Sequence, residues 1–405
     1  MKFNKENSTR KNTLSTELQS QSNARRRLTW KQLALVSVLI LWISVAGYFF
    51  IQFASFVFSP IEDSPPPTPS SHSKKIVTGN LPLQELWRWS GVVGGRGDPP
   101  KIIIQDEFIV FAYGVAEKHI SVFDARTGNE VWMSDDIRNL SSLDIDRDRI
   151  YVGTLKNVRA YQLGTGRQVW YALQQPPYKR GGLYVYSTDG KLEVYDVDLS
   201  GTPRNKRLYI LNPQTGETLD IIDRPDIFFR SGTIYYETRW IGGSFSSHLT
   251  AKDEVGGDAL WRLDFEGSPK RWPSVVDNIM YLDAGNIYAI DAETGNIHWQ
   301  YDAVQPVTSP QTGIETIPEN NYIPRVAYEG GMVYVVRSDA TIVGLDGQTG
   351  QEVGQIEIDS PPNYFDSDGF FRDTFYTIAV SDEFVAVYYN DSQELIVFKR
   401  QDTAD

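Results

Sequence analysis

The stretch DAETGNIHW at residues 291–299, preceded by the apolar run IYAI at 287–290, decides the fold of this chain. It predicts a strand, a tight turn and a second strand. Gly295 can adopt the left-handed conformation that a hairpin loop with a bulge requires, because it has no Cβ. The Asp291 carboxylate can accept hydrogen bonds from backbone N–H groups of the turn. The segment therefore predicts a β-hairpin whose second strand carries Trp299.

The same unit recurs along the chain. Its glycines are Gly128, Gly166, Gly216, Gly257, Gly295 and Gly350, and subtraction of their numbers gives spacings of 38, 50, 41, 38 and 55 residues. A polar residue stands four positions before each glycine: Asp124, Gln162, Asn212, Asp253, Asp291 and Asp346. Four positions after it stand Trp132, Trp170, Asp220, Trp261, Trp299 and Gly354. A period near forty with several short strands per period predicts a β-propeller with four-stranded antiparallel blades. An ordinary sandwich rich in Thr-Gly hairpins would not explain a Trp at a fixed offset.

The pattern aliphatic–Tyr–Ala–x–Asp–x–x–Thr–Gly–x–x–x–Trp resembles the repeat of the PQQ-like (quinoprotein) β-propellers, over about residues 81–401. Residues 287–299 match the whole repeat and 122–132 match nearly all of it, whereas the units at Gly216, Gly257 and Gly350 are degenerate. In that family the Trp docks against the neighbouring blade, so the resemblance implies this role for Trp87, Trp132, Trp170, Trp261 and Trp299. It implies the fold more than the function, because propellers host many unrelated activities.

The two ends of the repeat region predict how the ring closes. Residues 83–89, LQELWRW, resemble the Trp-bearing last strand of a unit, and no earlier strands accompany them. Residues 375–380, 384–389 and 394–399 supply three strands and no fourth. The N-terminal strand is therefore expected to complete the last blade, which protects the ends of the sheet. Seven blades result, at about 101–136, 137–174, 175–223, 224–266, 267–303, 320–358 and 366–400 with 83–89. The alternative is eight blades, which requires extra strands at 304–323 or 198–206.

The N-terminal region predicts a membrane anchor. Residues 1–32 form a basic tail of disordered composition: residues 1–31 hold eight Lys or Arg and two Glu, a net charge of +6. Residues 33–58 contain no charge and are long enough to cross a bilayer as a helix. The segment ends in bulky residues rather than at a small-residue cleavage site, so an uncleaved anchor is expected. The basic flank places the N-terminus in the cytoplasm and the propeller outside, on the periplasmic or extracellular side. Residues 59–80 read as a Pro/Ser-rich linker, and 402–405 as a short tail.

Composition excludes several kinds of chemistry. The chain contains no cysteine, so it has no disulfide, thiolate metal site, cysteine nucleophile, haem-attachment motif or lipidated N-terminal cysteine. The formal net charge of −13 becomes −19 outside residues 1–31, since −13 minus +6 is −19. An acidic domain repels nucleic acid, so neither DNA nor RNA is an expected partner.

Topology predicts a working face. In a four-stranded meander the links between blades and the loops between second and third strands lie on one face, opposite the Thr-Gly hairpins. Several of the longest irregular stretches fall there, at 90–100, 174–182, 239–247, 304–322 and 360–371. Long loops on a rigid scaffold are where binding surfaces usually form. Aromatic and arginine side chains are typical interface anchors, and the candidates are Arg96, Asp98, Tyr178, Arg180, Arg239, Trp240, Phe245, Tyr322, Tyr364 and Phe365. The alternative is that the aromatic residues only pack their own loops.

Candidates for metal binding or catalysis each have a structural interpretation. The histidines, His72, His119, His248 and His298, show no metal-ligand spacing. Asp144, Asp146 and Asp148 alternate like part of a calcium loop, but the required Gly and Glu are missing and a hairpin turn is favoured. Asp366 and Asp368 are the better calcium candidates. The tripeptide Arg96-Gly97-Asp98 matches a known adhesion motif, although matches of this length arise by chance.

We expect a non-catalytic scaffold that binds protein, or alternatively polysaccharide, outside the membrane, with no cofactor. The competing interpretation is a PQQ-dependent or other carbohydrate- or alcohol-active enzyme. Enzymes of the resembling family hold the quinone between a Trp and a disulfide of adjacent cysteines, with calcium and an Asp base, and this chain cannot form that disulfide. A more distant parallel is the propeller lipoprotein of the outer-membrane β-barrel assembly machine. The predicted helix replaces the lipid anchor of that protein.

Overall fold

The computed structural model describes residues 78–401, apart from 92–99, 114–117, 136, 174–180, 189, 199–205, 224–226, 232–233, 241–246, 254–256, 266, 268–272, 309–314, 317–325, 359–375 and 390–391. All described residues belong to one compact unit, Pro67–Asp405. The predicted membrane helix at 33–58 lies outside them. No helix within the described ranges is long and apolar enough to span a bilayer.

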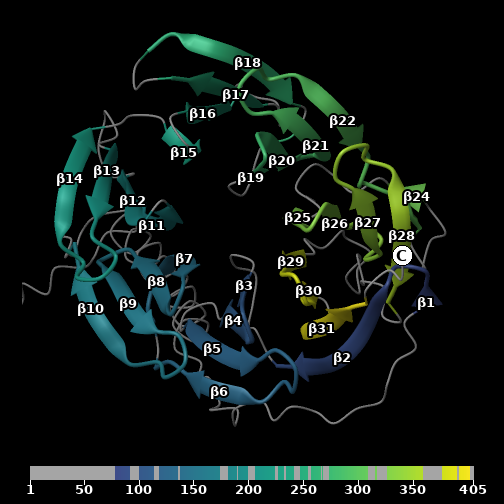
Figure 1. Ribbon diagram of the computed structural model, residues 1–405, viewed down its shortest axis with the longest axis horizontal. Helices are drawn as coiled ribbons and strands as arrows, with labels where there is room; N and C mark the ends of the chain where they lie inside the picture. The colour runs from purple at the N-terminus through teal and green to yellow at the C-terminus, as the bar shows by residue number, and fades with distance from the viewer. Residues whose placement is uncertain are drawn as a thin grey trace, which may run out of the picture. The chain divides into compact units, whose positions relative to one another are not determined.

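Seven antiparallel sheets follow one another around a ring, and the first strand of each lies innermost (Figure 1). Blade 1 consists of β3 (Lys101–Gln105), β4 (Phe108–Tyr113), β5 (His119–Asp124) and β6 (Glu130–Met133). Blade 2 consists of β7 (Leu140–Asp146), β8 (Arg149–Thr154), β9 (Val158–Gln162) and β10 (Gln168–Ala172). Blade 3 consists of β11 (Gly181–Thr188), β12 (Lys191–Asp198), β13 (Lys206–Leu211) and β14 (Thr218–Asp223). Blades 4 and 5 are β15 (Ile227–Ser231), β16 (Ile234–Trp240), β17 (Ser247–Lys252) and β18 (Ala259–Phe265); and β19 (Ser274–Val276), β20 (Ile279–Ala284), β21 (Asn286–Asp291) and β22 (Ile297–Tyr301).

Blade 6 is β25 (Val326–Glu329), β26 (Met332–Val336), β27 (Ile342–Asp346) and β28 (Glu352–Glu357), and blade 7 is β29 (Tyr376–Val380), β30 (Phe384–Tyr389), β31 (Glu394–Arg400) and β2 (Leu83–Ser90). The expected all-β, seven-bladed propeller is confirmed. The stretch at 304–323, which left an eighth blade open, contributes the two-stranded sheet of β23 (Val307–Thr308) and β24 (Glu315–Thr316). No eighth four-stranded sheet occurs among the described residues.

The N-terminal strand closes the ring as its sequence predicts. β2 pairs antiparallel with β31 along its length, from Leu83 opposite Arg400 to Ser90 opposite Glu394. The ring therefore joins strands from the two ends of the repeat region in one sheet (Figure 1). A further strand, β1 (Thr78–Gly79), pairs with the outer edge of β28. The repeat pattern gives no indication of this fifth strand in blade 6.

Apolar clusters between consecutive blades form the core. Strands alternate their side chains between the two faces of a sheet, so each blade can pack against both neighbours. The second strands are the most buried; all six residues of β30, Phe384–Tyr389, are buried. We call the contact between two consecutive blades a seam. Aromatic side chains fill several of them, such as Trp89, which lies edge-on to Phe111 at a centroid distance of 5.4 Å.

Candidate functional site

An indole ring docks on the next blade at five of the seven seams in the described part of the chain. Each indole Nε1–H donates a hydrogen bond to a backbone carbonyl of that blade: Trp87 to Ala125 at 2.8 Å, Trp132 to Leu163 at 2.5 Å, Trp170 to Pro213 at 3.1 Å, Trp261 to Ala292 at 3.1 Å and Trp299 to Gly347 at 2.9 Å. These contacts fix the blades to one another and hold the ring rigid.

The receiving turn is the Asp–x–x–Thr–Gly hairpin. Asp124 Oδ1 accepts hydrogen bonds from the backbone N–H and the hydroxyl of Thr127, both at 2.8 Å, and Asp346 makes the same contacts with Thr349. The Thr hydroxyl is the main cause of the lowered pKa of both carboxyls. The turn glycines lie under the indole rings with positive φ: Gly128, Gly166, Gly216, Gly295 and Gly350.

The seam between blades 6 and 7 uses a different contact. Blade 6 has Gly354 at the Trp position, and Leu81, which follows β1, packs over it. A Cβ on Gly354 would stand 2.9 Å from the backbone N of Leu81, and one on Gly344 would stand 2.4 Å from Leu81 Cδ1. Leu81 is only 4% exposed and joins an apolar cluster drawn from both blades. The N-terminal segment thus replaces the missing indole.

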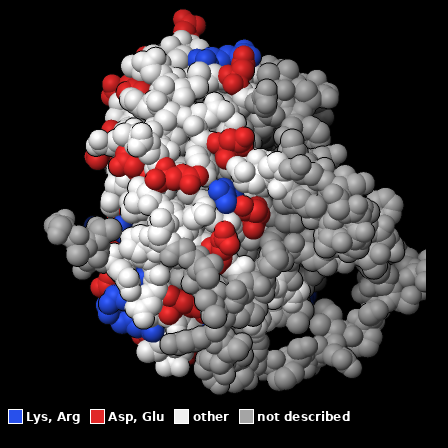
Figure 2. All heavy atoms as spheres, turned by 90° about the vertical axis from the view of Figure 1, so that its right-hand side faces the viewer, with Lys and Arg blue, Asp and Glu red and all other residues white. Residues whose placement is uncertain are grey.

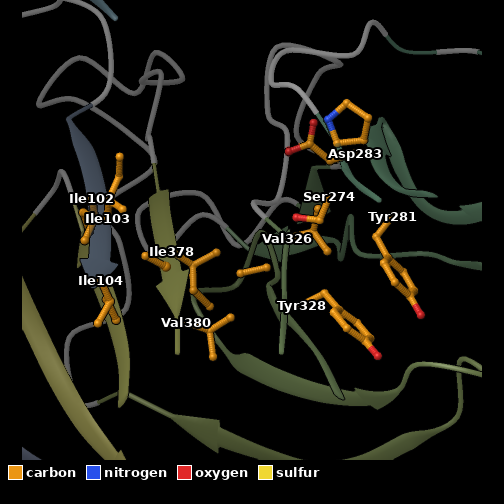
Figure 3. Close-up of a pocket in the computed structure, with 13 residues that line it drawn as sticks. Ile102, Ile103, Ile104, Ser274, Tyr281, Asp283, Val326, Tyr328, Ile378 and Val380 are labelled. Atoms are coloured by element: carbon orange, nitrogen blue, oxygen red, sulfur yellow. The ribbon is translucent and has the colours of Figure 1, made fainter. Parts of the chain in front are cut away.

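A cavity of about 230 Å³ lies among the innermost strands β3, β19, β25 and β29 and the second strand β20 of blade 5. Ile102, Ile103 and Ile104 line it on one side, and Tyr281 and Tyr328 on the other (Figure 3). The two tyrosine rings stack with centroids 4.5 Å apart. Ser274 on β19 and Asp283 on β20 add polar side chains to the lining (Figure 3). The described lining therefore combines apolar side chains with one carboxyl group, and more of the surface that it exposes is polar than apolar. We take it as a candidate small-molecule site.

The chemistry available in this cavity is limited. Burial raises the pKa of Tyr281, whose hydroxyl donates to the backbone carbonyl of Gly347 at 3.2 Å, so the phenol is protonated at neutral pH. Asp283 is 4% exposed and is the one carboxyl group among the described lining residues. Across the described ranges no three His, Cys, Asp or Glu side chains are grouped as metal ligands. The arrangement suits binding of a small group that can make both polar and apolar contacts.

The inner strands of blades 2 and 3 are joined by side chains. Ser142 Oγ on β7 donates to the carbonyl of Leu183 at 3.0 Å and accepts from the backbone N–H of Val185 at 2.7 Å. Asp144 Oδ2 accepts from the backbone N–H of Ser187 at 2.5 Å. Burial raises the pKa of the Asp144 carboxyl to about 7, against the opposing effect of its backbone hydrogen bonds, and the nearby Asp146 carboxylate raises it further.

The other aspartates and histidines of interest have local structural positions. The hairpin from β7 to β8 carries Asp144, Asp146 and Asp148. The sequence favours a hairpin turn at this point. His119 Nδ1 lies 3.3 Å from the carbonyl oxygen of Ser134. His248 lies on β17 and His298 on β22. His72 lies outside the described residues.

Most of the predicted binding-face residues also lie outside the described residues: Arg96, Asp98, Tyr178, Arg180, Phe245, Tyr322, Tyr364, Phe365, and the calcium candidates Asp366 and Asp368. Arg239 and Trp240 lie at the end of β16, where the backbone alone is described. The residues that sequence reasoning missed are Ser274 and Asp283 in the cavity, since each reads as an ordinary strand residue.

The described part of the outer surface is acidic on one side of the ring. Figure 2 shows the side of the ring that carries β22 and β28, and Asp and Glu outnumber Lys and Arg on its described atoms. Glu293, Glu352 and Glu357 are exposed there. The Tyr301 hydroxyl donates to Glu352 Oε1 at 2.6 Å and so links blades 5 and 6. This surface agrees with the net charge of the chain.

Comparison with known proteins gives a family and several partial relatives. A family model described as outer membrane protein assembly factor BamB matches residues 84–226 and 204–405. A quinohemoprotein alcohol dehydrogenase of Comamonas testosteroni is 34% identical over 125 residues, which are 30% of this chain and 17% of that protein. A polyvinylalcohol dehydrogenase of Pseudomonas sp is 26% identical over 116 residues, 28% of this chain and 17% of that protein. The chain thus spans less than a fifth of the length of either dehydrogenase.

Two solved structures align with this chain at low sequence identity. BamB from Moraxella catarrhalis aligns with a TM-score of 0.43 and 15% identity, covering 84% of this chain and 95% of that one. A europium-containing methanol dehydrogenase aligns with a TM-score of 0.45 and 11% identity, covering 78% of this chain and 93% of that one.

Proposed function

Because the chain belongs to the outer membrane protein assembly factor BamB family, we propose that it is a non-catalytic scaffold that binds a protein partner. The match of the family model across the propeller is the observation that carries this proposal. The family description concerns outer membrane protein assembly, and a ring of packed blades with the loop face that the sequence predicts suits such a role.

The physical basis of the scaffold is its rigidity. Indole contacts, the Leu81 contact and apolar clusters hold successive blades, and β2 joins the two ends of the ring. A binding surface on such a frame loses little conformational entropy on association, so more of the contact energy appears as affinity. Arg239, Trp240 and the aromatic residues of the long loops are the proposed anchors.

We propose further that residues 33–58 anchor the chain in a membrane, with the propeller outside and the N-terminal tail in the cytoplasm. The uncharged stretch and the basic residues before it support this orientation. The linker that follows is Pro-rich and would hold the propeller away from the bilayer surface.

The dehydrogenase relatives do not lead us to propose catalysis. Their matches cover a third of this chain or less in the two cases above. The chain also lacks the cysteines of the quinone-binding disulfide that the quinoprotein resemblance would require. An assay with added PQQ and calcium tests this directly: dye reduction with alcohols or sugars would show an enzyme and contradict our proposal.

Partner capture is the decisive experiment. The full chain is cross-linked in its native membrane, purified, and its partners are identified by mass spectrometry. We expect one stoichiometric protein partner, whose recovery falls at least tenfold in a Tyr322→Ala, Tyr364→Ala double variant. Tyr171→Ala is the matched control, since Tyr171 is 63% exposed on the outer strand β10 and is not one of the proposed loop anchors.

Three outcomes would count against the proposal. Equal recovery with the loop variant and the Tyr171→Ala control would remove the loop face as the binding surface. Recovery of polysaccharide without a stoichiometric protein would replace the partner class. Turnover with a bound cofactor would replace the scaffold function itself.

A further inference from the structure

β14 is the outermost strand of blade 3, and no described strand pairs with its outer edge (Figure 1). Five of its six residues are exposed. Leu219 and Ile221 are 55% and 54% exposed, more than any other large aliphatic side chain of the described residues. Such a strand presents unpaired backbone N–H and C=O groups, together with apolar side chains, to any extended chain that approaches it.

The chain itself shows how an outermost strand receives another segment. The equivalent strand of blade 6, β28, takes β1 on its outer edge. Next to that pairing, the Gln355 N–H donates to Asn80 Oδ1 at 3.0 Å, and the Asn80 N–H donates to the Gln355 carbonyl at 3.1 Å. The backbone of Gln355 therefore faces the outer edge and binds the added segment.

The repeat places Ile221 at the position of Gln355, because each follows its turn glycine, Gly216 or Gly350, by five residues. The N–H of Ile221 donates to Asp220 Oδ1 at 2.8 Å. A backbone N–H is a single donor, so one that bonds a side chain of its own strand is not used in the ladder with β13. The Ile221 N–H therefore belongs to the outer edge of β14, where the Asp220 carboxylate covers it.

The charges along this edge indicate the chemistry of a strand that would pair with it. Glu217, Asp220 and Asp223 are exposed. Arg207 on β13 lies 3.3 Å from the Asp223 carboxylate, so two of the three described acidic groups have no such ion pair with Arg207. A second copy of β14 would bring like charges together, which is destabilising. A strand that carries Lys or Arg would instead place opposite charges across the pairing.

We infer that the outer edge of β14 binds an extended, basic segment of a partner protein by strand addition. A Lys or Arg of that segment attracts the Asp220 carboxylate and so releases the Ile221 N–H, which then donates to a carbonyl of the segment. Apolar side chains of the segment contact Leu219 and Ile221. Main-chain hydrogen bonds supply the affinity, and Asp220 supplies the preference for a basic chain. None of the proposed loop anchors takes part, so the inference goes beyond the proposed function and does not depend on it.

Two short fluorescent peptides, one alternating Val with Lys and the other Val with Gln, test this preference by anisotropy with the full chain. We expect wild type to bind the Val/Lys peptide at least tenfold more tightly. Asp220→Ala uncovers the Ile221 N–H and removes the charge, so it should bind both peptides with similar affinity. Asp264→Ala is the matched control, because Asp264 is also exposed on an outermost strand, β18, and this variant should keep the tenfold preference. Equal binding of the two peptides by wild type, or a preference that survives in Asp220→Ala, would overturn the inference.

Two measurements on wild type separate strand addition from attraction by charge alone. A Val/Lys peptide methylated at alternate backbone nitrogens keeps its charge but lacks the N–H groups of one edge, so we expect it to bind at least tenfold more weakly. Hydrogen exchange locates the site: the unmethylated Val/Lys peptide should slow exchange of the β14 amides and leave those of β10, another outermost strand, unchanged. Equal binding of the methylated peptide, or protection that misses β14, would overturn the inference.

Discussion

The indole ring of Trp261 lies directly over Gly295, so that a Cβ built on this glycine would stand 2.7 Å from Trp261 Cδ2. The backbone of Gly295 has a φ of +74°, a conformation that residues with a side chain rarely adopt. Two separate requirements, the conformation and the close approach, therefore fall on one residue. The same relationship recurs at four other seams in the described chain.

The first prediction separates these two requirements. Gly295→Ala should lower the free energy of unfolding by more than about 3 kcal/mol, because strain and a clash with Trp261 add. Gly190→Ala is the matched control: its φ is +70° and nothing lies within 4 Å of the added Cβ. Strain alone should cost it about 1 kcal/mol. Urea unfolding monitored by Trp fluorescence measures the free energy of unfolding of both variants. Equal losses would show that the Trp261 ring moves aside for the added Cβ without destabilising the protein.

The second prediction concerns Arg88, which lies on the closing strand. Its guanidinium contacts Glu85 at 2.5 Å and 2.7 Å and lies 3.7 Å from Glu394 Oε2. Arg88→Leu should cost about 3 kcal/mol of stability, because two poorly exposed carboxylates lose their cation. Arg262→Leu is the control, since Arg262 and Asp264 are mostly exposed, and its effect should stay below about 1 kcal/mol. A similar loss of stability in both variants would contradict a stabilising role for the Arg88 ion pairs.

The third prediction is a dependence of stability on pH. The folded pKa of Asp144, about 7, lies above the ordinary value of 3.8. The protonated form thus favours folding, and this contribution is fully present below pH 4 and is lost as pH rises to 7. Asp144→Asn removes it while keeping an acceptor for Ser187. The variant should match the wild type near pH 4 and exceed its stability above pH 7, by on the order of 3 kcal/mol.

Thermal unfolding of both proteins between pH 4 and pH 8 checks this prediction. Subtracting the two curves cancels other groups that titrate in this range, such as Glu329, whose pKa burial and Asp382 raise. A stability difference that does not change with pH would mean that Asp144 is ionised throughout in the folded protein.

The fourth prediction concerns the contact that replaces an indole between blades 6 and 7. Leu81→Ala should destabilise the propeller by about 3 kcal/mol, because it removes a buried side chain and leaves a cavity over Gly354. Leu219→Ala changes a residue that is 55% exposed and should stay within about 0.5 kcal/mol. Denaturant unfolding of the two variants compares them directly; an equal effect would show that Leu81 contributes no packing.

Much of the fold could be predicted from sequence because its signals are local. The Thr-Gly turn recurs in five of the six units and a Trp four residues after the glycine in four of them, and the isolated Leu83–Trp89 strand predicts the closure with β31. β1 gives no such signal, since Thr78–Gly79 is two residues long and follows a Pro-rich stretch. Its pairing depends on the space that Gly354 leaves in blade 6.

Features that join distant residues were harder to predict. The environment of Asp144 depends on a backbone N–H group 43 residues later, and the cavity is assembled from five strands of four blades. Asp220 is an intermediate case: its place in the repeat shows that an indole is missing, but only the structure shows that its side chain is exposed and accepts a hydrogen bond from the backbone N–H of Ile221. The loop residues proposed for binding stay a prediction.

The pairing of β2 with β31 also sets the order of folding during synthesis. The ribosome releases Leu83 early and Arg400 more than three hundred residues later, and these two residues are partners in one sheet. Blades 1 to 6 can form progressively as they emerge, whereas the nascent chain must keep β2 unpaired until the final strand is made. Any chaperone that binds the nascent chain is therefore expected to cover β2 until β31 has been synthesised.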